Sequence, residues 1–103
     1  MLTGDGQLRA AQDALRKLDA ERKSIEVEAA AIVDELMAPG EGGAEPIGIE
    51  TPLVDREGYP RADIDVYRAR MQRKRLNGIR NDHKALMKRM EAGMAKCAAF
   101  SVS

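Results

Sequence analysis

The sequence predicts an all-α domain in which two long helices pair antiparallel, as a coiled-coil-like hairpin with an ordered connecting strap. Its 103 residues are enough for one small domain. Only 3% of them are aromatic and none is Trp, which argues against the aromatic-rich core of a small β-sandwich or barrel. Two stretches carry apolar residues at helical spacing, and all four prolines lie between these stretches.

A first helix is expected over about residues 6–38. Apolar residues recur there in alternating steps of three and four, which is typical of a helix in a coiled-coil contact. Arg22 is the one charged residue on this stripe. Pro39 and Gly40 end the helix, because the residue before a proline avoids helical geometry. The stripe consists of Leu8, Ala11, Leu15, Leu18, Ile25, Ala29, Ile32 and Leu36.

A second helix is expected over about residues 61–98. Its stripe consists of Leu76, Ile79, His83, Leu86, Met90, Gly93, Cys97 and Phe100. Three upstream apolar residues repeat at the same spacing but in another phase, which predicts a stutter just before Leu76. These are Ile64, Tyr67 and Met71. Gly78 predicts either a bend or a close approach of the first helix. We expect one continuous helix, with a break near Asn77 as the alternative.

The connecting segment covers residues 39–60. We expect residues 40–45 to be mobile and residues 46–60 to form an ordered strap across the helix pair. A solvated loop has little use for the four branched apolar side chains of this strap, which are Ile47, Ile49, Leu53 and Val54. A domain this small also needs the burial that such a strap adds. Residues 56–60 are interpreted as a turn, and we expect Leu53, Val54 and Tyr59 to pack this turn against the helices.

Acidic and basic residues are balanced, 17 of each, but they are unevenly distributed. Residues 1–58 carry a net charge of −7 and residues 59–103 one of +7. This favours two segments that lie against each other, although a surface ion pair contributes only about 0–1 kcal/mol. A nucleic-acid site stays as an alternative, based on a basic run without interleaved aromatic residues. The run consists of Arg68, Arg70, Arg73, Lys74, Arg75 and Arg80.

No catalytic, cofactor or metal site is predicted. Cys97 and His83, the single residues of their types, lie about 21 Å apart along one straight helix and cannot form a nucleophile pair. We interpret His83 as a hydrogen-bonded residue at the core boundary. Asp63 and Asp65 are interpreted as acids that complement the dipole in the first turns of the second helix. No apolar run approaches the roughly 20 residues that span a bilayer, so no membrane partner is expected.

Two stretches carry a resemblance to a known family. They are Thr51-Pro-Leu-Val-Asp-Arg-Glu-Gly-Tyr-Pro-Arg-Ala-Asp-Ile-Asp-Val-Tyr67 and Asn81-Asp-His-Lys-Ala-Leu-Met87. In this order and spacing, and over roughly residues 25–95, the chain resembles the N-terminal domain of the 26S proteasome non-ATPase regulatory subunit 9 family of assembly chaperones. The resemblance implies a helical domain that binds the C-terminal ATPase-module subdomain of one AAA+ ATPase subunit of the regulatory-particle base until the base is assembled. It implies no enzymatic activity, no cofactor, and a cytoplasmic and nuclear location.

The family continues into a PDZ domain, which this sequence, ending at Ser103, does not contain. We therefore expect no recognition of C-terminal peptides. As a separate expectation, the chain is a monomer in isolation, with a self-associating coiled coil as the main alternative. Candidate partner-binding residues are taken from the two motifs. Of these, Asp55 and Asn81 are expected to fix local backbone, and the charged ones have solvated or ion-paired roles as alternatives. The candidates are Asp55, Arg56, Arg61, Asp63, Asp65, Arg68, Asn81, Asp82 and Lys84.

Overall fold

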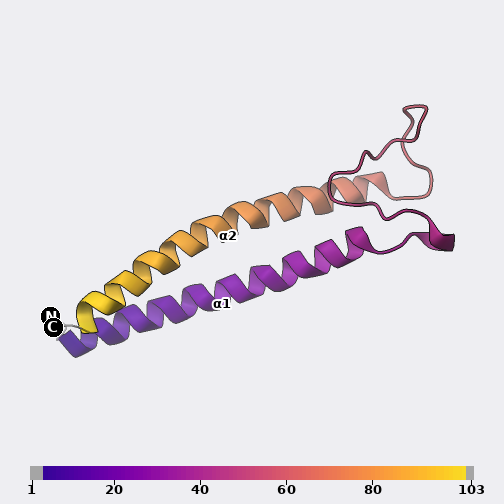
Figure 1. Cartoon of the computed structure of the whole chain (residues 1–103). Helices are drawn as coiled ribbons and strands as arrows, with labels where there is room; N and C mark the ends of the chain where they lie inside the picture. The colour runs from indigo at the N-terminus through magenta and orange to yellow at the C-terminus, as the bar shows by residue number, and fades with distance from the viewer. Residues whose placement is uncertain (1–3, 102–103) are drawn as a thin grey trace. The chain divides into compact units, whose positions relative to one another are not determined.

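The computed structural model describes residues 4–101 of the chain. It contains two long helices, α1 (Gly4–Met37) and α2 (Val66–Ser101), with a short 3-10 helix, η1 (Glu41–Gly43), in the segment that joins them (Figure 1). Within the described residues, β-type pairing is limited to one isolated bridge between Val54 and Pro60. The predicted all-α fold is confirmed.

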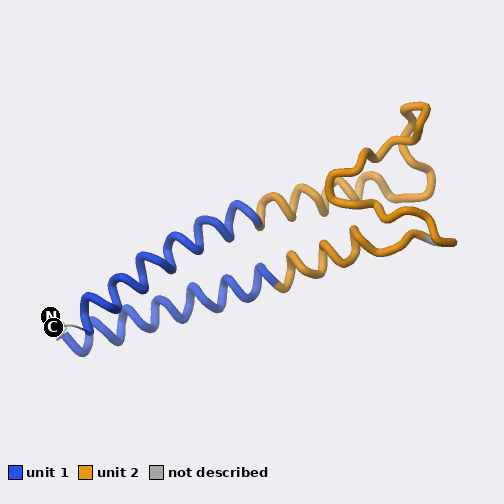
Figure 2. Tube along the Cα trace, viewed as in Figure 1, with its two compact units in different colours: residues 1–26, 80–103 blue, residues 27–79 orange. Residues whose placement is uncertain are grey.

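The chain forms two compact units, each built from parts of both helices (Figure 2). Unit 1 comprises residues 1–26 and 80–103, and unit 2 comprises residues 27–79. Unit 2 is therefore one continuous stretch of sequence that includes the connecting segment. Unit 1 is made from two stretches that are distant in sequence.

In unit 2 the helices run antiparallel. Arg75 pairs with Glu28, with Nη2 and Oε2 2.6 Å apart, and Arg68 pairs with Glu35, with Nη2 and Oε1 2.7 Å apart. As the residue number rises from 68 to 75 along α2, the number of the paired residue on α1 falls from 35 to 28. Both pairs join the acidic half of the sequence to its basic half, in line with the charge asymmetry.

In unit 1 the same order continues. His83 Nε2 lies 2.9 Å from Glu26 Oε1, while Gly93 lies against Leu15, so later residues of α2 meet earlier residues of α1. The antiparallel helix pair that the sequence predicts is thus present in each unit.

The predicted stripe of α1 is confirmed. All eight of its apolar members are buried or half-buried, and Leu36 is completely buried. Arg22, the charged member, is neutralised by its own helix: its guanidinium lies 2.6 Å from Asp19 Oδ1 and 2.9 Å from Glu26 Oε2. The helix ends at Met37, just before Ala38 and Pro39, as the proline predicts.

The stutter predicted for the second helix is wrong. Tyr67 and Met71 are 75% and 47% exposed, whereas Ala69 is completely buried and Gln72 is half-buried. Counted from Ala69 and Gln72, the alternating steps of three and four run without a slip to the end of the stripe. The apolar pattern missed these two positions because one residue is small and the other polar; the Gln72 amide donates to Glu35.

Helix α2 also begins later than predicted, at Val66 rather than near Arg61. Asp65 is the N-cap: its Oδ1 accepts a hydrogen bond from the Arg68 backbone N–H at 2.9 Å, and its carbonyl accepts the first helical bond, from the Ala69 N–H. Asp63 and Asp65 therefore precede the helix instead of lying in its first turns. The helix then continues through Gly78 without a break and ends at Ser101.

Most of the fully buried side chains lie in unit 2. Seven apolar residues are buried in the described chain, and the two that belong to unit 1 are Ala11 and Leu86. Those of unit 2 are Leu36, Leu53, Ala69, Leu76 and Ile79. The core is therefore concentrated in unit 2, which contains the connecting segment. A small domain buries little surface, so the apolar side chains of this segment are a needed addition to the helix pair.

The connecting segment is ordered, as predicted for residues 46–60. The Gly48 N–H donates to the Leu36 carbonyl at 2.8 Å, which satisfies an end of α1, and Leu53 is buried. Residues 40–45 close on themselves through a 2.9 Å hydrogen bond from the Gly40 N–H to the Ala44 carbonyl. Their mobility stays a prediction.

The glycine that permits close approach of the helices is Gly93. A Cβ placed on it would lie 3.2 Å from Leu15 Cδ1, whereas a Cβ on Gly78 would meet nothing within 4 Å. The close approach predicted for Gly78 is therefore wrong, because a side chain at this position would point into open space.

Candidate interaction surfaces

The strap turn, residues 54–60, is organised by one carboxylate. Asp55 Oδ1 accepts hydrogen bonds from the backbone N–H groups of Glu57 at 2.9 Å and Tyr59 at 3.0 Å, while the Asp55 N–H donates to the Tyr59 carbonyl at 2.7 Å. Gly58 has φ +87°, a value that a side chain disfavours. Asp55 is thus committed to local backbone, as the sequence predicted.

Beside this turn, Arg61 and Asp63 form an ion pair, with Nη2 and Oδ2 2.7 Å apart. The Arg61 guanidinium also donates to the Glu45 carbonyl at 3.3 Å and is largely shielded from solvent. The hydrogen bond from Arg61 lowers the pKa of Asp63 below its ordinary value. These two predicted contact residues therefore also support the connecting segment, and their contact with a partner stays a prediction.

Arg73 holds the strap to α2. Its guanidinium donates to the carbonyl oxygens of Ile47 at 3.1 Å, Gly48 at 2.9 Å and Thr51 at 2.7 Å. A planar fork of donors in fixed geometry suits these converging carbonyl groups, and its Nε–H adds a second bond to the Gly48 carbonyl. Sequence analysis missed this role because it placed Arg73 in the basic run; no apolar or motif signal marks it.

The basic run is partly consumed by intramolecular contacts. Arg73 is bound to the strap, and Arg68 and Arg75 are paired with Glu35 and Glu28. A nucleic-acid site needs its cations available for phosphates, so these contacts disfavour that alternative.

Three apolar side chains of the first motif point to solvent. Val54 is 43% exposed, Tyr59 66% and Tyr67 75%, so the expected packing of Val54 and Tyr59 against the helices is wrong. The backbone bonds of the turn explain this, because they hold its conformation without help from side-chain packing. Arg56 is exposed beside them and makes no ion pair with residues 4–101. A surface hollow of about 550 Å³ opens next to Val54 and Arg56.

The candidates of the second motif lie on α2 in unit 1. Asn81, Asp82 and Lys84 are exposed and make no side-chain hydrogen bond or ion pair within the described chain. Between them, His83 is half-buried and bonded to Glu26, as expected of a boundary histidine. The hydrogen bond from His83 lowers the pKa of Glu26, and Arg22 adds to this effect.

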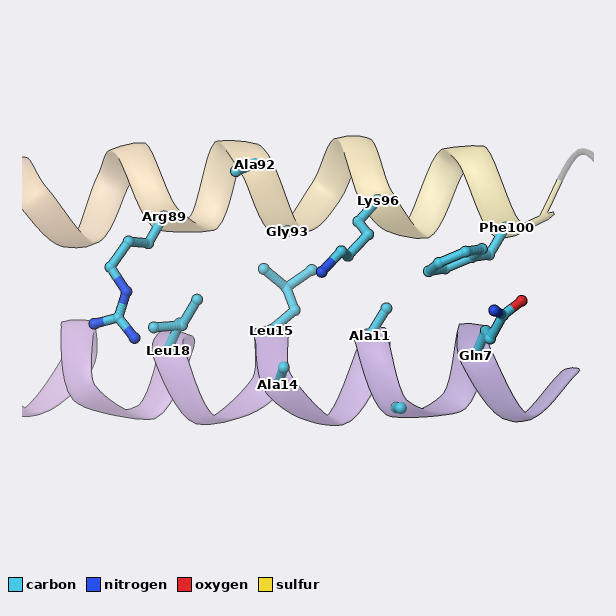
Figure 3. A pocket seen from close by; sticks show the side chains of 11 residues that line it. Gln7, Ala11, Ala14, Leu15, Leu18, Arg89, Ala92, Gly93, Lys96 and Phe100 are labelled. Carbon is cyan, nitrogen blue, oxygen red and sulfur yellow. The ribbon is translucent and has the colours of Figure 1, made fainter. Parts of the chain in front are cut away.

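Unit 1 also contains an open groove of about 500 Å³ between its two helices (Figure 3). Leu15, Leu18 and Phe100 supply its apolar lining. Arg89 and Lys96 extend from α2 across it toward α1, so long side chains of the protein itself bridge the groove. No group of three or more potential metal ligands occurs in the described residues, and none of their helices is long and apolar enough to cross a membrane.

Comparison with known proteins places these features in a family. The family model described as the Nas2 N-terminal domain matches residues 15–98. The chain is 42% identical over 83 residues to the mouse protein named 26S proteasome non-ATPase regulatory subunit 9, covering 81% of this chain and 33% of that protein. The rat protein of the same name is 54% identical over 48 residues, 47% of this chain and 22% of its own length.

A more distant relative is the probable 26S proteasome regulatory subunit p27 of Saccharomyces cerevisiae, 44% identical over 43 residues, which cover 42% of this chain and 20% of that protein. The chain thus spans about a third or less of the relatives it matches. No solved structure matches it. With the family model covering most of both helices and the strap between them, the chain belongs to the Nas2 N-terminal domain family.

Proposed function

We propose that this domain is a proteasome assembly chaperone module that binds the C-terminal ATPase-module subdomain of one AAA+ ATPase subunit of the regulatory-particle base. The names of its relatives support a role at the 26S proteasome. The observation that carries a binding role is the strap turn: its backbone is fixed by Asp55, yet Val54 and Tyr59 are left in solvent.

The strap turn suits protein recognition for a physical reason. A preorganised loop loses little conformational entropy on binding, and exposed tyrosines supply large amphipathic contact areas. The Arg73 and Arg61 contacts fix the segment that presents Tyr59. Bound there, the domain would act by steric exclusion, since a neighbouring ATPase subunit cannot occupy the covered face.

An NMR titration tests the proposal. Isotope-labelled chain is titrated with the C-terminal ATPase-module subdomain of each proteasomal ATPase subunit separately. We expect shifts with one subunit, centred on residues 52–68. The Tyr59→Ser variant should bind it at least tenfold more weakly, as for an interface anchor.

Met37→Ser is the matched control, because Met37 is also an exposed apolar residue of unit 2 but lies outside both motifs. It should bind like the wild type. An absence of shifts with every subunit would refute binding by this domain. If the bound ATPase subunit still joined its ring neighbour with unchanged affinity, the exclusion mechanism would be wrong.

A further inference from the structure

One flank of α2 in unit 1 combines exposed methionines with free cations. We define the methionine flank as Arg80, Lys84, Met87, Lys88 and Met94. Met87 and Met94 are 45% and 54% exposed. All five residues line one surface hollow of about 560 Å³.

This hollow is lined by residues of α2 alone. Met94 also lines a second hollow, of about 450 Å³, together with Met90 of α2 and Leu15 and Arg16 of α1. The two hollows therefore share one lining residue, Met94. Leu15 and Met90 belong to the apolar stripes of the helix pair, so the second hollow borders the packed contact, whereas Met87 and Met94 lie outside the stripe of α2.

The charges on this flank have no intramolecular use in the described chain. Arg80, Lys84 and Lys88 form no ion pair there, in contrast to Arg68 and Arg75, which pair with acids of α1. Glu91 is the one acid that lines the hollow, and His83 is bonded to Glu26. The flank is therefore net positive, so it attracts an acidic partner and repels a basic one.

The groove shown in Figure 3 is less suitable as a docking site. Arg89 and Lys96 lie across it, so an occupant would first have to displace them. The hollow of the methionine flank, in contrast, is lined by α2 alone, so no side chain of the flank spans a gap between the two helices. Methionine is unbranched and polarisable, and it adapts its shape to different apolar surfaces.

We propose that the methionine flank docks an amphipathic helix of a partner protein, with apolar side chains over Met87 and Met94 and acidic side chains paired with Arg80, Lys84 and Lys88. The flank follows α2 for about 21 Å between residues 80 and 94, which matches about four turns of a partner helix. The proposal does not rest on the strap turn, which belongs to unit 2.

The test uses a designed helical peptide of about three heptads, with Leu at the a and d positions and Glu at the e and g positions. It is titrated into the labelled chain at low salt. We expect shifts confined to residues 80–94 and to the α1 residues of the shared hollow. The double variants Lys84→Glu/Lys88→Glu and Met87→Ser/Met94→Ser should each bind about tenfold more weakly or worse.

Two controls keep the outcome decisive. The Arg89→Glu/Lys96→Glu variant reverses two charges beside the groove and should bind like the wild type. The same peptide with Lys in place of Glu should not bind. The proposal is overturned if the acidic peptide causes no shifts, if the flank variants bind it normally, or if the shifts map to the groove. A dimer of the chain that Lys84→Glu/Lys88→Glu dissociates would also overturn it, since the occupant would then be a second copy.

Discussion

Arg73 lies between Ala69 and Leu76 on the buried side of α2. A cation there is tolerated because its Nε and Nη2 groups donate hydrogen bonds to the carbonyl groups of Ile47, Gly48 and Thr51. The residue therefore links two elements, the strap and the helix, that the hydrophobic pattern alone does not connect.

Arg73→Lys should lower the free energy of unfolding by about 2 kcal/mol, because lysine lacks the fixed planar fork that bonds the Gly48 carbonyl through both Nε and Nη2. Urea unfolding measures this. Amide exchange in residues 47–51 should also accelerate. Arg70→Lys is the control, since Arg70 is an exposed cation of the same helix with no ion pair in residues 4–101. Equal stability of the two variants would contradict the role of Arg73.

The two α2 glycines should respond differently to alanine. Gly78→Ala adds a methyl group in open space, so we expect a gain of about 0.5–1 kcal/mol from helix propensity. Gly93→Ala should gain clearly less, because its Cβ would lie 3.2 Å from a Leu15 methyl group that must move. Thermal unfolding of both variants compares them. A larger gain for Gly93→Ala would show that the helices do not approach closely there.

At the scale of the element, the start of α2 depends on Asp65. Asp65→Ala removes the acceptor of the Arg68 N–H and should cost about 1 kcal/mol. The first turn of α2 should fray, which circular dichroism and amide exchange of residues 66–69 detect. Asp82→Ala serves as the comparison, since Asp82 is an exposed acid inside the same helix. If both substitutions cost the same, Asp65 does not act as a cap.

Asp19, Arg22 and Glu26 form a charged cluster on α1. This cluster should make the free energy of unfolding depend on pH. Hydrogen bonds lower the pKa of Glu26 below its ordinary value of 4.5, with His83 the largest cause. The unfolded state therefore binds protons first, so the stabilisation from Glu26 is complete above pH 4.5 and is lost as the pH falls through its lower folded pKa. The urea concentration at the midpoint of unfolding should therefore decrease as the pH is lowered below 4.5. Glu26→Gln should flatten this fall; an unchanged profile would exclude Glu26 as its source.

The apolar stripe of α1 could be predicted from the sequence because its residues recur in alternating steps of three and four, with Arg22 as the one charged member. The seam of α2 was partly missed, since Ala69 and Gln72 carry little hydrophobic signal and two exposed apolar residues, Tyr67 and Met71, imitated another phase. The later start of α2 depends on a side-chain hydrogen bond of Asp65, which spacing does not encode.

At the candidate site, a role that depends on neighbouring residues could be predicted from the sequence, whereas contacts between distant segments could not. Local turn chemistry identified Asp55, because an aspartate before a glycine turn bonds to nearby backbone. Long-range partners, such as Glu45 for Arg61 and Glu35 for Arg68, depend on how segments meet and leave no local pattern. Whether the exposed motif residues contact a partner stays a prediction.

For the molecule as a whole, the helix pairing bears on the oligomeric state. Both apolar stripes are buried or half-buried within one chain, so little of either remains for a second copy. We expect sedimentation equilibrium to give a monomer from about 10 to 100 µM, a range in which a dimer of micromolar affinity would show. A mass that rises with concentration would favour the self-associating coiled coil.

Because unit 2 is one uninterrupted stretch of sequence and contains most of the buried side chains, it can form through contacts between residues near in the chain. Folding by local contacts is fast, whereas unit 1 must close a loop that contains all of unit 2. The hairpin should therefore zip from the connector toward the two chain ends. Truncating Leu36 or Leu76 would then slow folding, while truncating Leu86 would mainly hasten unfolding.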